Sequence, residues 1–174
     1  MTGFIIGIIL LIIFLPLLIA GFSGAPWVPI RKRDIKRINK LANLKPGQRF
    51  IELGSGDGRV CHYIAKSNPK VDVRGIEYSW FMVAISRIRA VLDPVDNLNI
   101  ILGNAFKTDI SNADVLFFYF LPKTMEKILK KKLLSEMKPE AKVISYVFRF
   151  KKWPGKCSAH KPTGSTSPFY VYSR

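Results

Sequence analysis

The stretch that decides the fold reads ELGSGDGR and runs from Glu52 to Arg59. It follows a run of strand length, residues 49–53 (RFIEL), and precedes a helical pattern over residues 58–66. Glycine permits positive φ and lets a ligand approach the backbone closely. The first turn of the following helix offers free N–H groups. The stretch therefore predicts a ligand-binding loop between a strand and a helix.

Spacing and charge indicate what kind of ligand this loop would hold. The glycines follow the pattern G-x-G-x-G, whereas dinucleotide-binding domains use G-x-G-x-x-G beside a pyrophosphate. Glu77 ends the next predicted strand, 19 positions after Gly58, and its carboxylate can accept hydrogen bonds from both hydroxyls of a ribose. Glu52 and Asp57 add negative charge, which disfavours a pyrophosphate and favours a cationic ligand. An adenine-containing, cationic cofactor is thus predicted, with an NAD-type domain as the alternative.

Strand and helix patterns alternate along the rest of the chain. Such alternation predicts a Rossmann-like α/β fold, a mostly parallel sheet with helices on both faces and ligands at the carboxyl ends of its strands. The expected strands are residues 49–53, 71–77, 99–102, 115–120 and 142–148, with a last antiparallel hairpin of residues 156–160 and 169–172. The expected helices are residues 30–44, 58–66, 80–92 and 123–137.

Two of these helices carry apolar stripes that we expect to face the core. Ser79 is placed to cap the helix over residues 80–92, whose stripe comprises Phe81, Ile85, Ile88 and Leu92. In the helix over residues 123–137 the expected inward side chains are Met125, Ile128, Leu129 and Leu133. Its expected outer face carries lysines at 123, 127, 130, 131, 132 and 138.

Composition narrows the class of protein. The 174 residues include 28 Lys and Arg against 12 Asp and Glu, a formal net charge of +16, and 48% are hydrophobic. Such a chain is neither disordered nor collagen-like. Its two cysteines lie 96 positions apart, which argues against a disulfide framework and for a reducing compartment. The basic excess is compatible with binding to nucleic acid or to anionic lipid.

The amino terminus carries a membrane signal. Residues 4–22, FIIGIILLIIFLPLLIAGF, contain no charged side chain and have about the length that a helix needs to cross a bilayer. The alternatives are a cleaved signal peptide, which usually has a basic segment before a shorter apolar core, and a buried core helix, which rarely lacks any polar position over such a length.

The residues after this span set the expected topology. Six Lys and Arg residues lie between positions 31 and 40, and such a cluster favours the cytoplasmic side of the membrane. We expect residues 1–24 to be a single transmembrane anchor and residues 25–44 a connector with a basic amphipathic helix. Residues 45–174 would form the soluble domain, on the cytoplasmic side. Trp27 suits the headgroup level of the bilayer.

The glycine loop together with Glu77 resembles motif I and its successor in the seven-β-strand methyltransferases, which use S-adenosylmethionine (SAM). The resemblance implies that the loop cradles the amino-acid part of SAM, that Glu77 holds the ribose, and that Asn104 and Ala105 face the adenine. The cofactor-binding residues implied in this way are Glu52, Gly54, Ser55, Gly56, Asp57, Gly58, Glu77, Tyr78, Asn104 and Ala105.

A closer resemblance extends over about residues 26–174. Trp27-Val28-Pro29, LANLKPGQRFIELGSGDGRV, GIEYSWFMVAISRIRA, VLFFYFLP and Trp153-Pro154 follow one another in the order found in a family of membrane-anchored protein lysine methyltransferases. That family is related to the mitochondrial enzymes that modify the ATP synthase c-subunit and the adenine nucleotide translocase. This chain is similar to its small prokaryotic members. Glu140 departs from the pattern, which usually has glycine after Lys-Pro.

Methyl transfer from a sulfonium is an in-line displacement, so the enzyme must align the nucleophile with the methyl group. A lysine nucleophile must also lose its proton, which burial favours by lowering the lysine pKa. The aromatic end of the fourth strand fits a narrow substrate site, and we assign Tyr119 and Pro122 as catalytic candidates. The Asn/Asp-Pro-Pro-Tyr/Phe motif of amide and adenine methyltransferases is absent from the sequence. The four Cys and His residues at 61, 62, 157 and 160 do not match zinc spacing, so no metal site is predicted, and Cys61 reads as a small core residue.

The sequence thus predicts a SAM-dependent methyltransferase acting on a lysine of a membrane-associated protein. The alternatives are a lipid or quinone substrate, a nucleic-acid substrate, and a tethered module that binds SAM without turnover. The basic residues cluster at positions 31–40 and 123–138, where lipid and solvent also explain them, which argues against nucleic acid. Oligomeric state is left open.

Overall fold

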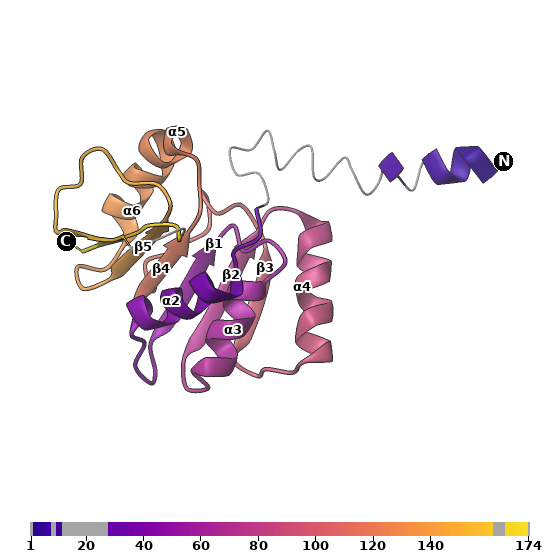
Figure 1. The fold of residues 1–174 in the computed structure, drawn as a ribbon, viewed down its shortest axis with the longest axis horizontal. Coiled ribbons are helices and arrows are strands. Elements are labelled where there is room, and N and C mark those ends of the chain that lie inside the picture. Colours follow the sequence, from indigo (N-terminus) through magenta and orange to yellow (C-terminus); the bar gives the residue numbers. More distant parts are fainter. Residues whose placement is uncertain (1, 8–9, 12–27, 162–165, 174) are drawn as a thin grey trace.

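The structure, a computed structural model, describes residues 2–7, 10–11, 28–161 and 166–173. A seven-stranded sheet with the order β3-β2-β1-β4-β5-β7-β6 forms its centre (Figure 1). The strands are β1 Arg49–Leu53, β2 Asp72–Glu77, β3 Leu98–Leu102, β4 Val115–Phe118, β5 Lys142–Tyr146, β6 Cys157–His160 and β7 Phe169–Tyr172. The first five pair in parallel, whereas β7 is antiparallel to both β5 and β6. The predicted Rossmann-like sheet with a carboxyl-terminal hairpin is confirmed.

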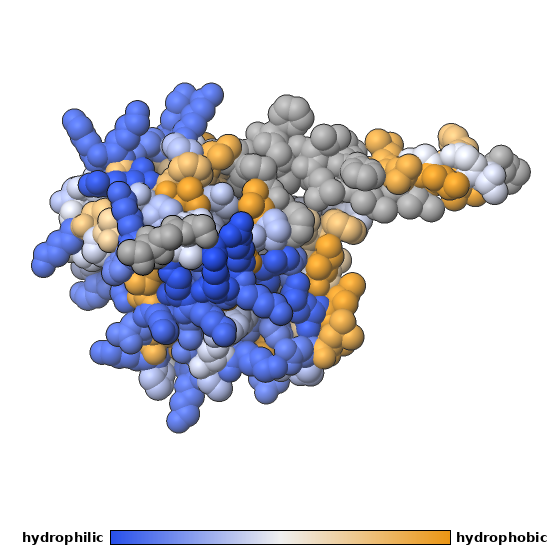
Figure 2. Space-filling model, in the orientation of Figure 1, coloured by the Kyte–Doolittle hydropathy of each residue, from blue (hydrophilic) through white to orange (hydrophobic). Residues whose placement is uncertain are grey.

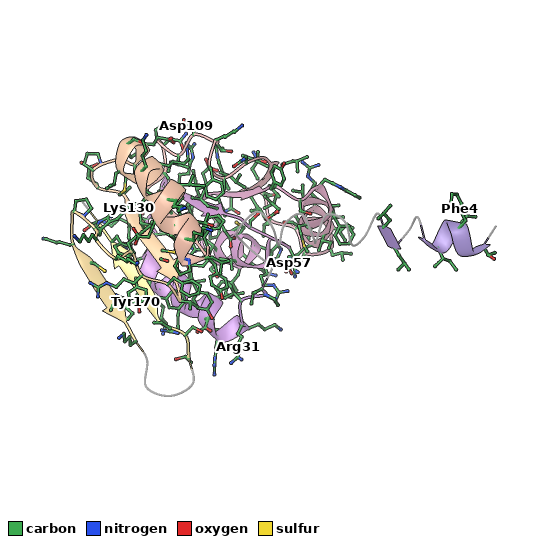
Figure 3. All side chains as sticks on the ribbon, turned by 90° about the horizontal axis from the view of Figure 1, so that it is seen from above. Phe4, Arg31, Asp57, Asp109, Lys130 and Tyr170 are labelled. Carbon is green, nitrogen blue, oxygen red and sulfur yellow. The ribbon has the colours of Figure 1, made fainter. Side chains whose placement is uncertain are left out.

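Helices cover both faces of the sheet. One face carries α2 (Lys32–Ala42), α3 (Arg59–Ser67) and α4 (Trp80–Leu92), and the other carries α5 (Pro122–Thr124), the π-helical turn η1 (Met125–Leu129) and α6 (Lys130–Glu136). Each face has its own buried core, and β1 contributes Phe50 to the first and Ile51 to the second because side chains alternate along a strand. Figure 3 shows Arg31, at the start of α2, and Lys130, at the start of α6, on opposite faces.

The capping role predicted for Ser79 is confirmed, because its hydroxyl accepts the N–H of Met82. The predicted core stripe of the same helix is wrong. Met82, Val83 and Ser86 are buried, whereas Ile88 and Leu92 are 59% and 80% exposed. Apolar residues surround most of α4, so periodicity alone does not identify its inner side. The inner side is the one with the small Ser86, because α4 approaches the glycine loop closely there.

The helix predicted over residues 123–137 is interrupted by a wider turn. Met125, Leu129 and Leu133 are buried as expected, but Ile128 is 50% exposed. Lys132 is buried against expectation, and its Nζ bonds the Glu136 carboxylate at 2.5 Å. The π-helical turn η1 holds more residues than an α-helical turn, which rotates the side chains that follow it relative to an ideal helix.

Two further predictions concern the basic helix over residues 30–44 and the apolar segment before it. In α2, Ile35, Ile38 and Ala42 are buried. Within the described ranges, no helix is long and apolar enough to cross a membrane. Residues 12–22 of the expected span, and Trp27, lie outside the described residues.

Candidate active site

The glycine loop turns back over β2 directly after β1. The backbone N–H groups of Gly54 and Ser55 both donate to the carbonyl oxygen of Ile76, at 2.8 and 3.0 Å. The three glycines of the loop have φ values of 76°, 54° and 71°, in the left-handed region where a side chain is strained. The loop thus lies at the carboxyl ends of β1 and β2, where the sequence placed it.

Glu77 connects this loop to the start of α4. Its Oε2 accepts the N–H of Gly56 and its Oε1 accepts the N–H of Ser79, both at 2.8 Å. A carboxylate offers about four acceptor positions, so each oxygen keeps one for a ligand hydroxyl. Glu77 is partly exposed. The backbone therefore fixes a carboxylate that can still receive a ribose, and the site fits SAM at this point.

Asp57 is held by two arginines. It is 5% exposed and accepts hydrogen bonds from Arg59 Nη2 at 2.6 Å and Arg89 Nη2 at 2.9 Å. Burial alone would raise the pKa of Asp57, but the Arg59 hydrogen bond and both guanidinium charges hold this pKa below its ordinary value. Arg89 of α4 also donates to the Asp57 carbonyl oxygen, so its guanidinium contacts both the side chain and the backbone of Asp57. Asp57 thus anchors the loop to α4.

Glu52 lies on the α3 side of β1. It is 3% exposed, and its Oε2 accepts the backbone N–H of Cys61 at 3.2 Å and the Cys61 thiol at 2.9 Å. Burial, reinforced by the negative charges of Asp57 and Glu77, raises the pKa of Glu52 to about 8. Cys61 is fully buried, as predicted. The contact of Glu52 in this structure is Cys61, and its expected contact with SAM stays a prediction.

Gly58 and Ser55 pack the glycine loop against α4 and β2. A Cβ built on Gly58 would lie 1.8 Å from Ser86 Oγ, so only glycine lets α4 pack this closely. A Cβ on Gly75 of β2 would meet Ser55 Oγ at 2.8 Å, which shows that the Ser55 side chain lies over β2. We therefore expect Gly58 and Ser55 to contact SAM through their backbone atoms.

Three of the predicted cofactor-binding residues, Tyr78, Asn104 and Ala105, follow β2 and β3. These strands are parallel neighbours with Glu77 paired to Leu102, so Tyr78 and Asn104 follow them at the same edge of the sheet. Tyr78 is 59% exposed and presents an open aromatic ring. Asn104 shapes the turn after β3, because its Oδ1 accepts the N–H of Phe106 at 2.8 Å. Ala105, in the same turn, is 8% exposed.

The catalytic candidates lie beyond β4. Tyr119 is half-buried, with its ring 5.1 Å from that of Tyr146 and 6.1 Å from that of Phe148. Pro122 is exposed and opens α5, so it directs the chain rather than offering a reactive group. Sequence reasoning missed Tyr146 and Phe148, although they end the fifth predicted strand and β4 and β5 are parallel neighbours. The structure therefore brings three aromatic rings together at this edge.

The sequence of this chain is similar to those of known proteins. The model of the ANTKMT methyltransferase domain matches residues 52–157. A protein-lysine N-methyltransferase of Saccharolobus islandicus (strain REY15A) is 31% identical over 137 residues, covering 75% of this chain and 81% of that protein. The lysine N-methyltransferase of Xenopus laevis that is named for the ATP synthase c-subunit is 29% identical over 129 residues, covering 74% of this chain and 55% of that protein.

A solved structure agrees with the fold over most of the chain. An RNA methyltransferase from Salinibacter ruber in complex with S-adenosyl-L-homocysteine superposes with a TM-score of 0.76 and 29% identity, covering 83% of this chain and 92% of that one. The matched family domain spans the glycine loop, Glu77 and the aromatic end of β4. On these grounds, the chain belongs to the ANTKMT methyltransferase domain family, and its cofactor is SAM.

Proposed function

We propose that this chain is a membrane-anchored enzyme that transfers a methyl group from SAM to a lysine side chain of a membrane protein. The observation that carries the proposal is its similarity, over three quarters of its length, to a protein-lysine N-methyltransferase. Relatives named for a lysine of the ATP synthase c-subunit support a substrate embedded in a membrane. The chain spans about half the length of these two relatives.

The roles of the cofactor residues follow from their positions. SAM supplies a methyl group on a sulfonium. In this proposal the Glu77 carboxylate receives the ribose hydroxyls through the acceptor positions that Gly56 and Ser79 leave free. The exposed ring of Tyr78 and the turn at Asn104 and Ala105 enclose the adenine. The open backbone of the glycine loop holds the amino-acid part, with the ionised Asp57 supplying negative charge behind it.

The lysine would enter beside Tyr119. In this proposal the rings of Tyr119, Tyr146 and Phe148 displace water from around the amine, and loss of solvation disfavours the ammonium form. The neutral amine is the nucleophile that the displacement requires. Packing of the rings against one another fixes their orientation, and alignment of amine and methyl group supplies much of the rate. Pro122 sets the path of the chain after Tyr119.

The anchor remains part of the proposal on sequence grounds. Residues 4–22 have the length and apolarity of a transmembrane helix. The basic residues that follow favour the cytoplasmic side for the domain. Such a tether would keep the enzyme at the surface where a membrane protein exposes its loops.

The test is the fate of a labelled methyl group. Full-length protein is incubated with methyl-labelled SAM and membranes from cells that lack this chain, and methylated lysine in a protein band is the expected result. Label extracted into the organic phase would identify a lipid or quinone substrate instead. If the protein binds SAM but transfers no methyl group to any cell fraction, it is a SAM-binding module and not an enzyme. Glu77→Gln, which is expected to bind SAM more weakly, serves as the control for transfer that depends on this site.

RNA is the second candidate substrate. The Salinibacter ruber protein of similar fold is named as an RNA methyltransferase, and Lys123, Lys127 and Lys131 are exposed along α5, η1 and α6. Exposed lysines bind the phosphates of a nucleic acid whatever its base sequence. The same incubation with total RNA decides between the candidates: label that ribonuclease releases and protease does not would favour RNA.

A further inference from the structure

The outer face of α4 is apolar and open to solvent. Trp80, Ile88, Val91 and Leu92 are 51%, 59%, 76% and 80% exposed. Figure 2 shows hydrophobic residues gathered along this helix, with hydrophilic residues beside them. Surface helices of soluble domains normally turn charged residues outward, and a contiguous exposed apolar patch marks an interaction site.

Neither the fold nor the cofactor site accounts for this face. Within the described residues, both cores are built without Ile88, Val91 and Leu92. Helix α4 begins at the carboxyl end of β2, beside Glu77, and runs back along the sheet, so these three residues lie at the end of α4 away from the cofactor edge. The described part of the domain therefore leaves this face uncovered.

We propose that this face of α4 docks onto the surface of an anionic lipid bilayer. The inference rests on the proposed membrane anchor and adds a second contact that orients the domain. A helix that lies in the bilayer interface combines aliphatic side chains and tryptophan on one side with basic residues at its flanks. The α4 face has this composition, with Arg87 exposed among Trp80, Ile88, Val91 and Leu92.

Charge on the neighbouring helix favours the same orientation. Helix α2 packs on α3, which packs on α4, along one face of the sheet. The exposed basic residues of this face include Arg31, Lys32, Lys36 and Lys40, and Figure 2 shows the hydrophilic surface next to the apolar strip. Helix α6 packs on the opposite face of the sheet, and Figure 3 shows Lys130 there, at its start. A bilayer that receives α4 can therefore also attract α2 through its anionic headgroups, but not α6.

The length of the tether supports contact with this face. The expected span ends at residue 22, and the described domain resumes at Val28, an interval that reaches about 20 Å when fully extended. Ile30 is buried in the same core as α2, α3 and α4, so the connector leaves the domain on the side of these helices. In this proposal the short connector keeps the side of the domain that carries α2, α3 and α4 close to the bilayer.

The experiment places a polarity-sensitive probe on each face of the full-length protein. In a Cys157→Ser background, Val91→Cys is labelled with a nitrobenzoxadiazole dye, and Lys131→Cys on α6 is the matched control, since both positions are exposed and Cys61 is buried. The proteins are reconstituted into vesicles of phosphatidylcholine and phosphatidylglycerol. We expect a blue shift and quenching by spin-labelled lipid at position 91 and neither at position 131. Quenching at 91 should weaken in vesicles of phosphatidylcholine alone.

Each other outcome overturns the proposal in a distinguishable way. A chain that floats with the vesicles while position 91 reports water keeps its anchor but does not dock α4. If the protein does not float with the vesicles, both the membrane anchor and the docking of α4 are contradicted. A blue shift that appears without lipid and grows with protein concentration assigns the face to a second copy. As a further check, Leu92→Glu should abolish the quenching at position 91 while SAM binding and thermal unfolding stay unchanged.

Discussion

Glu77 and Gly56 are joined by a hydrogen bond of 2.8 Å from the Gly56 N–H to Glu77 Oε2. This bond couples the end of β2 to the middle of the glycine loop. The other carboxylate oxygen accepts the N–H of Ser79, so one side chain ties together the loop and the start of α4. The residue assigned to the ribose thus also shapes the loop assigned to the rest of SAM.

Glu77→Gln should weaken SAM binding by about 10–100-fold, because hydrogen bonds to a charged group contribute about 1.5–3 kcal/mol each. The amide keeps one acceptor oxygen but loses the charge and replaces the other acceptor with a donor. Calorimetric titration with SAM measures the change. Glu140→Gln, at an exposed position, is the control and should bind normally. Equal affinity of both variants would remove Glu77 from the site.

Gly58→Ala should destabilise the fold more than Gly47→Ala. Both glycines have positive φ, 71° and 82°, which costs an alanine about 1–2 kcal/mol. A Cβ at Gly58 would also meet Ser86 Oγ at 1.8 Å, whereas nothing lies within 4 Å of one at Gly47, and overpacking adds about 1–3 kcal/mol. Urea unfolding curves measure the difference. Equal losses would mean that α4 does not approach the loop as closely as described.

Arg89→Ala should loosen the glycine loop and lower SAM affinity about fivefold. Its guanidinium holds both the carboxylate and the carbonyl oxygen of Asp57, but it is partly exposed, so solvent reduces the contribution to about 1 kcal/mol. Arg87→Ala, two positions away and exposed, is the matched control. Titration of both variants with SAM gives the comparison. The assignment fails if Arg87→Ala loses as much affinity as Arg89→Ala.

Glu52 should make stability fall as pH rises. Its pKa is raised from 4.5 to about 8 in the folded state, so the folded chain binds more protons than the unfolded chain between these values. The free energy of unfolding then decreases across that interval, by an amount on the order of a few kcal/mol. Glu52→Gln should flatten this dependence and be the more stable protein at pH 8. Denaturant unfolding at pH 5 and pH 8 measures both, and parallel curves for the two proteins would contradict the assignment.

Tyr119→Phe should slow methyl transfer while leaving SAM binding unchanged. The hydroxyl is the only polar group that the substitution removes, and the ring contacts with Tyr146 and Phe148 are retained. If the hydroxyl orients the amine, the rate constant should fall about tenfold or more. Methyl incorporation into membranes measures the rate. Tyr63→Phe on α3 is the control, and an equal rate in both variants would exclude Tyr119 from the chemistry.

Features set by neighbouring residues were accessible from the sequence. The glycine loop, the cap at Ser79 and the alternation of strands and helices depend on short-range backbone preferences. All three were predicted, because glycine spacing and hydrophobic periodicity are local properties. The position of Glu77 at the loop follows for the same reason, since the ends of adjacent parallel strands meet at one edge.

Contacts between distant segments came only from the tertiary structure. Arg89 reaches Asp57 across 32 positions, and the Tyr146 hydroxyl donates to Asp34 across 112 positions. The π-helical turn η1 exposes Ile128 and buries Lys132, which an ideal helical projection assigns the other way round. No local pattern specifies such pairings, because each depends on how two elements pack.

Helix α4 shows most clearly what the sequence determined and what packing decided. Its sequence determined that a helix begins after Ser79 and that the helix is largely apolar. Which side meets the core was decided by the close approach of Ser86 to Gly58, a fit between two segments that are separate in the sequence. Hydrophobic periodicity records how much apolar surface a helix has, but packing selects which part of that surface is buried. The tertiary structure therefore turned the predicted core stripe of α4 into an exposed face.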